Sequence, residues 1–169
     1  AICSATNQSP TPYSTTFNTL CNSEIAPYIE NFDNGISNCW SQELSNDDFD
    51  WTLNSGPTPS NGFGTGPTDD ISGGGNYIYT EASNPRDPGD VAIIYSSFID
   101  ISNLSSPELN FYYHMFGQNM GTLEIEIFDG NSFTNIFTLT GDQGDQWFQN
   151  SIPILTSSNI IQLKIIGEI

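Results

Sequence analysis

Acidic side chains are the strongest candidates for chemistry in this sequence. Six aspartates fall in three short segments: Asp33, then Asp47, Asp48 and Asp50, then Asp69 and Asp70. A calcium ion takes roughly six to eight oxygen ligands, and carboxylates that converge from separate loops can supply them. A cation site is therefore one interpretation of the pattern. The alternative is that these are solvated turn residues whose carboxylates accept hydrogen bonds from backbone amides.

Other residue types that carry catalysis do not form a convincing set. His114 is the only histidine, so a Ser-His-Asp or Cys-His arrangement would have to use it. It lies within an aromatic run, which favours a structural histidine, and nothing activates Cys39 as a thiol partner. Glu124 and Glu126 are two apart on one predicted strand, which favours a solvated face over the paired carboxylates of a glycoside hydrolase. We therefore predict that the chain is not an enzyme.

The charge balance restricts the class of partner. Only Arg86 and Lys164 oppose twenty acidic residues, which gives a formal net charge of −18. Long-range electrostatics then repel nucleic acids and anionic lipid. Charged residues are only 13% of the chain, and eleven Phe with seven Tyr can supply a core, so the composition is that of a folded domain. We expect no nucleic-acid partner.

Three cysteines indicate an exported protein with one disulfide. Cys3, Cys21 and Cys39 fit no zinc-binding spacing, so one bridge and one remaining thiol is the simplest interpretation. We favour Cys3–Cys21, with a bridge that uses Cys39 as the alternative. No apolar run is long enough to span a membrane, and no signal peptide precedes Ala1, so we expect the sequence to be cut from a longer protein.

Short stretches rich in β-branched and aromatic residues follow one another along the chain, and helical periodicity is nearly absent. The predicted strands are Tyr77–Thr80, Val91–Tyr95, Leu109–Met115, Leu123–Phe128, Ser132–Phe137, Gln146–Ile154 and Asn159–Ile166. Residues 52–76 are rich in Gly, Pro, Ser and Thr and predict a long surface loop. Short strands at this spacing predict an all-β fold, an antiparallel β-sandwich of jelly-roll type.

Four ordered motifs run through residues 30–166. They are Phe32-Asp33 with Cys39-Trp40 and Asp47-Asp48-Phe49-Asp50-Trp51; Thr68-Asp69-Asp70-Ile71 with Gly75-Asn76-Tyr77-Ile78-Tyr79; Leu109 to Gly117 with Gly121 to Ile125; and Gly141-Asp142 with Trp147. Together they resemble the MAM domain, a module shared by meprins, neuropilins and receptor tyrosine phosphatases. The style of the Cys39-Trp40 motif and of the loops is similar to versions in Bacteroidetes surface proteins. Residues 1–20 resemble the last strands of a fibronectin type III domain.

The resemblance implies site residues as well as a fold. It places a structural cation, calcium or another such as sodium, near Asp33, Asp47, Asp48, Asp69 and Asp70, and it gives Trp40, Trp51 and Trp147 packing roles rather than roles in stacking on sugars. The family usually has a cysteine where this chain has Asn31, so Cys39 is either free or paired with Cys21. The terminal Asp-Asp strand of the family is absent, and we expect the last strand to be missing.

These observations predict an N-terminal segment over residues 1–22 and a MAM-like sandwich over residues 23–169. The predicted function is a non-catalytic adhesion or recognition module of a larger secreted or cell-surface protein. Its partners would be a protein or glycan at a surface and the neighbouring domains of the same polypeptide. The alternative is a calcium-dependent carbohydrate-binding module attached to a secreted enzyme.

Overall fold

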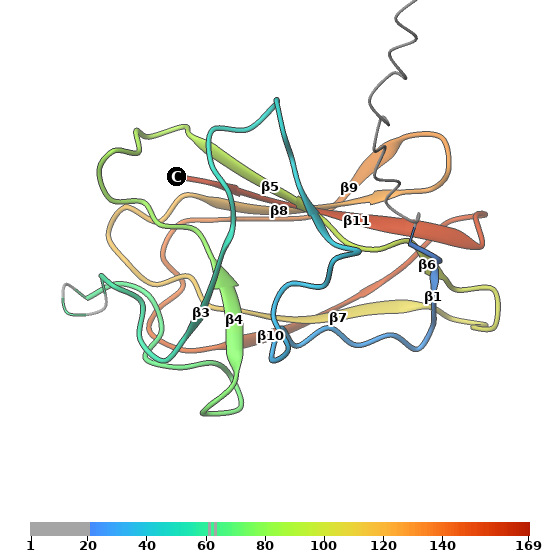
Figure 1. Ribbon diagram of the computed structural model, residues 1–169, viewed down its shortest axis with the longest axis horizontal. Coiled ribbons are helices and arrows are strands. Elements are labelled where there is room, and N and C mark those ends of the chain that lie inside the picture. Colours follow the sequence, from blue (N-terminus) through green and yellow to red (C-terminus); the bar gives the residue numbers. More distant parts are fainter. Residues whose placement is uncertain (1–20, 61, 63) are drawn as a thin grey trace, which may run out of the picture.

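The computed structural model describes residues 21–60, 62 and 64–169, and these residues form β-strands and loops without an α-helix (Figure 1). The strands are β1 (Glu24–Ile25), β2 (Ser41–Gln42), β3 (Thr52–Ser55), β4 (Asn76–Tyr79), β5 (Val91–Tyr95), β6 (Ile99–Asp100), β7 (Glu108–Tyr113), β8 (Thr122–Phe128), β9 (Phe133–Thr140), β10 (Phe148–Pro153) and β11 (Ile160–Glu168). None of the described residues forms a helix of the length and apolarity that crossing a bilayer requires.

The larger layer is a sheet organised around β11. This strand pairs antiparallel with β5 on one side and with β8 on the other. The sheet continues from β5 to β2 and from β8 to β9. At its N-terminal end β11 pairs instead with β6, which pairs in parallel with β1. The longest strand of the described chain therefore holds both halves of the sheet together.

The second layer lies opposite this sheet and consists of two strand pairs (Figure 1). β7 pairs with β10 along their whole lengths, and β3 pairs with β4. The two layers make the antiparallel β-sandwich of jelly-roll type that the strand pattern predicted.

Alternation along the strands explains which side chains meet between the layers. In β8, Ile125 and Ile127 are 3% and 6% exposed, whereas the intervening Glu126 lies on the outer face. β11 contributes Ile161 and Leu163 in the same way. Burying a large aliphatic side chain stabilises a fold by about 1.5–3 kcal/mol, so the period-two pattern sets the register as well as the layer.

The predicted strands correspond closely to β4, β5 and β7–β11, and the sequence missed four others. Residues 52–76 are not a single loop, because Thr52–Ser55 forms β3 and pairs with β4. The strands β1, β2 and β6 have two residues each, which is too short for an alternating pattern to appear in the sequence. The predicted fibronectin-like strands lie in residues 1–20, outside the described residues.

The predicted Cys3–Cys21 disulfide is wrong. Cys21 is bridged to Cys39, with an S–S distance of 2.11 Å and Cα atoms 5.6 Å apart. Cys3 lies outside the described residues. The physical reason is the path of the chain between Cys21 and Cys39. Cys21 precedes β1, and the segment after β1 folds back so that Asn38 and Cys39 lie beside Cys21. The Cys21 sulfur is 3.9 Å from the Asn38 carbonyl oxygen.

Candidate functional site

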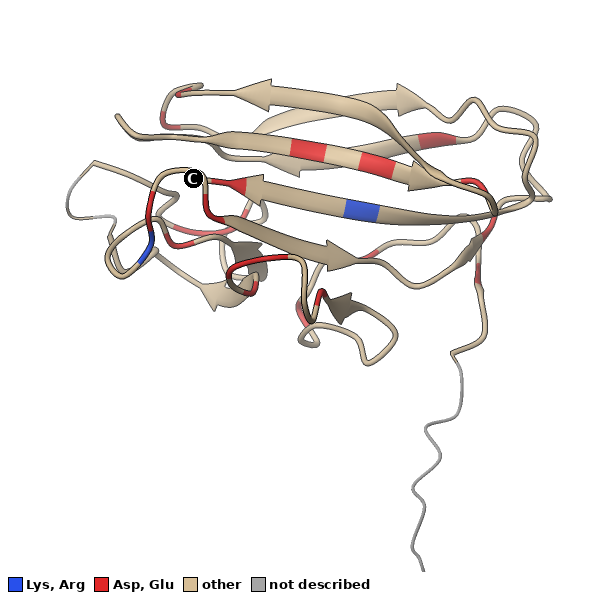
Figure 2. Ribbon diagram, turned by 90° about the horizontal axis from the view of Figure 1, so that it is seen from above, with Lys and Arg blue, Asp and Glu red and all other residues tan. Residues whose placement is uncertain are grey.

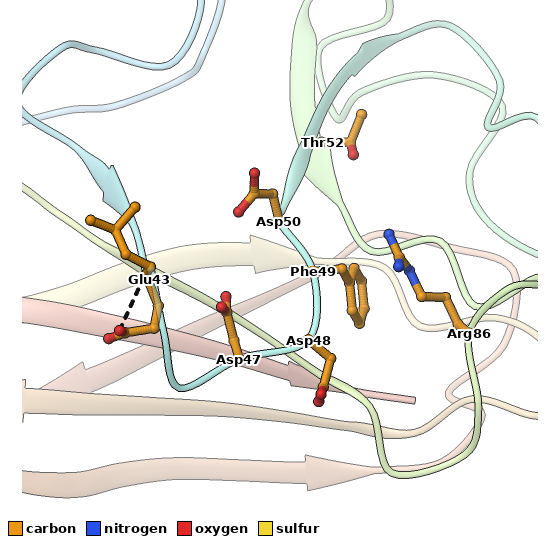
Figure 3. A pocket seen from close by; sticks show the side chains of 8 residues that line it. Glu43, Asp47, Asp48, Phe49, Asp50, Thr52 and Arg86 are labelled. Atoms are coloured by element: carbon orange, nitrogen blue, oxygen red, sulfur yellow. Dashed lines mark hydrogen bonds between the residues drawn. The ribbon is translucent and has the colours of Figure 1, made fainter.

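An acidic hollow on the surface contains one group of the predicted aspartates (Figure 3). Its volume is about 540 Å³, and it is lined by Glu43, Leu44, Asp47, Asp48, Phe49, Asp50, Thr52 and Arg86. Figure 3 shows the carboxylates of Asp47 and Asp50 on the side of Glu43, whereas Arg86 lies over the Phe49 ring. The guanidinium carbon of Arg86 is 4.3 Å from the centre of that ring.

Backbone pairing with β5 fixes this segment. The Asp48 N–H donates to the Val91 carbonyl at 2.8 Å, and the Val91 N–H donates to the Asp48 carboxylate at 2.9 Å. The Ile93 N–H donates to the Asp47 carboxylate at 3.1 Å. Both carboxylates therefore satisfy backbone donors of a sheet strand that would otherwise lack partners.

Two carboxyl groups of the hollow titrate differently because their surroundings differ. The Tyr95 hydroxyl donates to Glu43 at 2.8 Å, and this bond, with those from the backbone N–H groups of Leu44 and Ser45, lowers the pKa of Glu43 to about 2. Partial burial raises the pKa of Asp47, and the charges of Asp50 and Glu43 raise it further. The hollow thus concentrates negative charge that Arg86 offsets only in part.

A second group of aspartates surrounds the turn before β4. Asp70 accepts hydrogen bonds from the Ser72, Gly74 and Gly75 backbone N–H groups, and from the Ser72 hydroxyl at 2.6 Å. These bonds, that of the Ser72 hydroxyl foremost, hold the pKa of Asp70 well below its ordinary value. Asp33 accepts from the Asn76 N–H at 2.9 Å.

This turn leaves no room for a side chain at Gly75. A Cβ atom there would lie 2.6 Å from one Asp33 carboxylate oxygen and 2.7 Å from one of Asp70. Asp33 is brought to this place by Phe32, which has a φ of 61° and packs its ring edge-on against Trp40 at 5.3 Å. Asn31, where the family usually has cysteine, donates to the Asp33 carboxylate at 2.7 Å.

The predicted cation ligands therefore fall into two groups. The carboxylates of Asp33 and Asp70 lie close together at Gly75. Asp69 belongs to the same group: its carboxylate accepts a hydrogen bond from the Asp70 N–H, and its backbone carbonyl accepts one from the Trp147 indole N–H. Asp47 and Asp48 belong to the hollow. Among the described residues, no three His, Cys, Asp or Glu side chains are arranged so that they could hold a metal ion.

The role that the geometry shows for most of these carboxylates is to accept backbone hydrogen bonds, which was the alternative to metal binding. Sequence reasoning missed Glu43 and Arg86, which line the hollow, and Tyr95, whose hydroxyl donates to Glu43. The signal that could have found Glu43 is its place four residues before the Asp47-Asp48 pair. Tyr95 comes beside Glu43 through the pairing of β5 with β2, and Arg86 reaches the hollow from the segment between β4 and β5, through its contact with the Phe49 ring. The sequence displays neither relation.

The remaining candidates have structural partners. The His114 side chain is 3% exposed, and its Nε2 lies 3.2 Å from an Asp145 carboxylate oxygen. The three tryptophans direct their indole N–H groups to internal acceptors: Trp40 to the Tyr28 hydroxyl, Trp51 to the Ala92 carbonyl and Trp147 to the Asp69 carbonyl. This geometry fits packing roles for the tryptophans.

Comparisons with known proteins identify the family of the chain. The family described as MAM domain, meprin/A5/mu, matches residues 31–169. MAM domain-containing glycosylphosphatidylinositol anchor protein 1 from Gallus gallus is 37% identical over 115 residues, which are 64% of this chain and 12% of the relative. The human protein of the same name is 35% identical and covers 70% of this chain with 13% of its own length. Neuropilin-1a from Danio rerio is 35% identical, with shares of 69% and 13%.

A solved structure shares the fold at low sequence similarity. A cleaved adhesin domain of Lys-gingipain from Porphyromonas gingivalis superimposes with a TM-score of 0.53 at 15% identity, covering 82% of this chain and 93% of that one. This likeness concerns the fold alone.

These matches also delimit the predictions. The three curated relatives named above are vertebrate proteins, and the matches give no support to the predicted Bacteroidetes version. This chain spans about an eighth of the length of each of them. As expected, the chain is a domain of a secreted or cell-surface protein. It belongs to the MAM domain family.

Proposed function

We propose that the chain is a non-catalytic adhesion or recognition module within a larger secreted or cell-surface protein. The observation that carries the proposal is the match of residues 31–169 to the MAM family. A relative named as a MAM domain-containing glycosylphosphatidylinositol anchor protein supports a role in a cell-surface protein. The burial of the His114 side chain and the internal hydrogen bonds of the tryptophans support a role without catalysis.

Beads that carry the full chain test the adhesive function. We expect them to bind to cultured vertebrate cells and to lose that binding after trypsin treatment of the cells, because the proposed partner is a surface protein. Beads that carry the same chain after reduction and alkylation in urea, with loss of the near-ultraviolet circular dichroism verified before coupling, are the matched control, since they keep the charge and lack the fold. Equal retention of both kinds of bead, or retention by none of a panel of cell lines, would contradict the proposal.

A structural cation is a further part of the proposal, and of the two groups of predicted aspartates we propose the one in the acidic hollow, with Asp47 and Asp48, as its site. Its support is the family resemblance and the crowding of carboxylates around Asp47, whose pKa is raised by burial first and by the charges of Asp50 and Glu43 in addition. Because no described group of three such side chains is arranged as a metal site, binding would require some of them to rotate toward the ion. A cation would also reduce the self-repulsion of a chain with net charge −18.

Calcium should therefore raise the melting temperature above the effect of sodium chloride at equal ionic strength, since a ligand bound by the native state stabilises it. Asp47→Asn should diminish this rise, and Glu124→Gln on the face of β8 should leave it unchanged. Scanning calorimetry of the three proteins measures the effect. Identical curves in calcium and in sodium chloride would leave the aspartates with their backbone hydrogen bonds as their only role.

A calcium-dependent carbohydrate-binding module stays the alternative proposal. The inward hydrogen bonds of the three indole N–H groups lend it no support. Retention of the full chain on insoluble polysaccharides in calcium, reversed by a chelator, would favour it over protein recognition.

A further inference from the structure

The outer face of the large sheet carries a row of exposed residues across three strands. In the strand register, Asp100 of β6 lies opposite Ile25 of β1 and also opposite Ile160 of β11. Directly opposed residues of neighbouring strands project on the same face of a sheet. Ile25 is 71% exposed and Ile160 is 36% exposed. The row is therefore two accessible isoleucines with a carboxylate between them.

Alternation along β6 extends the row and fixes its direction. Ile99 is 8% exposed and belongs to the core, so its neighbours Phe98 and Asp100 project outward. Phe98 is 42% exposed, and its carbonyl accepts the Glu24 N–H at 2.8 Å, which keeps it aligned with β1.

A second row lies beside the first. Gln162 of β11 is opposite Phe128 of β8, which is opposite Phe133 of β9. The Phe128 and Phe133 rings are 5.1 Å apart, and Phe133 is 36% exposed. We call Ile25, Phe98, Asp100, Ile160 and Phe133 the outer-face patch. Exposed large apolar side chains that are contiguous mark interaction sites more often than scattered ones do.

The charges of the patch indicate what can cover it. The Asp100 carboxylate accepts the Ser102 N–H at 2.9 Å, and no described cation pairs with it. Alternation along β11 places Lys164 on the same face as Ile160, and Lys164 is held by Glu126 at 3.0 Å and lies 5.5 Å from the Phe133 ring centre. Figure 2 shows a blue segment within a strand of the large sheet beside red segments of the neighbouring strand. A partner that covered the isoleucines would remove water from Asp100, and a carboxylate that loses water without a positive partner is strongly destabilised.

The same reasoning disfavours a second copy of the chain. A twofold contact centred on this row would place two Asp100 carboxylates near each other. The two molecules would each bring a net charge of −18. Charge complementarity instead requires a partner that supplies a cation at the centre and apolar groups around it.

We propose that the outer-face patch is the docking surface for a partner protein segment that presents a Lys or Arg to Asp100, with apolar side chains on either side to cover Ile25, Phe98 and Ile160. The proposal rests on the proposed function and names the surface and the partner chemistry through which recognition would occur.

Selection of random peptides displayed on phage against the full chain tests the surface. The selected peptides should combine apolar residues with Lys or Arg. Asp100→Asn keeps the shape and an acceptor for Ser102, and we expect it to weaken their binding by about fivefold or more, with a loss that shrinks at high salt. The combined variant Ile25→Thr, Phe98→Thr and Ile160→Thr should abolish binding while retaining residues suited to strands.

The control variant is Leu44→Ser, because Leu44 is 94% exposed and lies in the acidic hollow, outside the patch. It should bind the selected peptides as the unmodified chain does. Three results would overturn the proposal: no enrichment, enriched peptides without basic residues, or peptides that bind Asp100→Asn and the triple variant with unchanged affinity. Near-ultraviolet circular dichroism confirms that each variant folds, and Asp100→Asn decides the question if the triple variant does not.

The bead assay separates failure of this inference from failure of the proposed function. If the unmodified chain binds cells and the folded Asp100→Asn and triple variants bind them equally well, the docking role of the outer-face patch is refuted. The adhesive function would then still stand. Absence of cell binding by the unmodified chain would refute the function, and the peptide selection would still decide the patch. Sedimentation that revealed a dimer lost in the triple variant would show that a second copy occupies the surface and would overturn the proposal.

Discussion

At the scale of single residues, His114 is held in an environment that opposes its charge. Burial lowers its pKa, and the hydrogen bond and charge of Asp145 offset this only in part. The unfolded chain therefore binds a proton at a higher pH than the folded chain does. The contribution of neutral His114 to stability is fully present above the unfolded pKa of about 6.5 and is lost as the pH falls toward the lower folded pKa.

We expect the free energy of unfolding to fall between about pH 7.5 and pH 5.5, and to fall less in His114→Gln, which cannot be protonated. Urea denaturation at both pH values measures the difference. Carboxylates away from His114 have the same surroundings in both proteins, so the comparison isolates the histidine together with its contact to Asp145. Parallel pH profiles for the two proteins would show that His114 has the same proton affinity in the folded and unfolded states.

Tyr95 and Glu43 form another titrating pair with a defined geometry. Burial and the hydrogen bond to Glu43 raise the pKa of Tyr95 to about 12. Glu43→Gln removes the negative charge, so ionisation of Tyr95 should begin at lower pH. Ultraviolet difference titration of the tyrosines measures this shift, and Glu124→Gln serves as the control because Glu124 does not contact Tyr95. An unchanged titration in Glu43→Gln would assign the high pKa to burial alone.

From the sequence we could predict which carboxylates have a structural or binding role. We could not predict which of them lie close together in the fold. Asp70 followed by Ser72 and glycines is a local turn pattern, and the hydrogen bonds of Asp70 are indeed local. Asp47 is fixed by Ile93, 46 positions away. No spacing within residues 47–50 reveals that partner, so the acidic hollow had to be found in three dimensions.

At the scale of elements, the turn before β4 depends on the absence of a side chain at one position. Gly75→Ala would push a Cβ atom into the Asp33 and Asp70 carboxylates, both of which accept backbone hydrogen bonds. We expect a loss of about 1–3 kcal/mol in stability, the range for steric overpacking. Gly62→Ala should be nearly neutral because a Cβ there meets nothing within 4 Å. Chemical denaturation of both variants checks the contrast, and equal losses would contradict it.

Strands with a clear alternation were predictable, and short or uniform ones were not. β8 alternates Leu123, Glu124, Ile125, Glu126 and Ile127, and its range was predicted to within one residue. β3 contains Leu53 between polar residues, and that leucine is exposed at the protein surface. The sequence of β3 therefore has no apolar face from which a strand could be predicted. Pairing with β4, and not its own composition, makes β3 a strand.

At the scale of the whole molecule, the Cys21–Cys39 bridge closes a loop across the N-terminal part of the domain. Chain-entropy reasoning gives about 3 kcal/mol for a loop of this length, because the bridge restricts the unfolded chain. Cys21→Ser should lower the free energy of unfolding by that amount, and Cys3→Ser should leave the bridge intact. Urea denaturation and peptide mapping without reduction measure both effects. A Cys3–Cys21 peptide in the digest would contradict the structure.

The position of β11 in the sheet has a consequence for how the protein is made. β11 is the last of the described strands in sequence, yet it lies between β5 and β8 and pairs with both. A ribosome adds about 5–20 residues per second, so several seconds pass between the synthesis of β5 and the synthesis of residues 160–168. The edge of β5 that pairs with β11 is exposed during this interval. During that interval β5, with the apolar run Ala92-Ile93-Ile94, is an open template for foreign strands. A chaperone that shields this edge in the secretory route would protect the nascent domain at its most vulnerable moment.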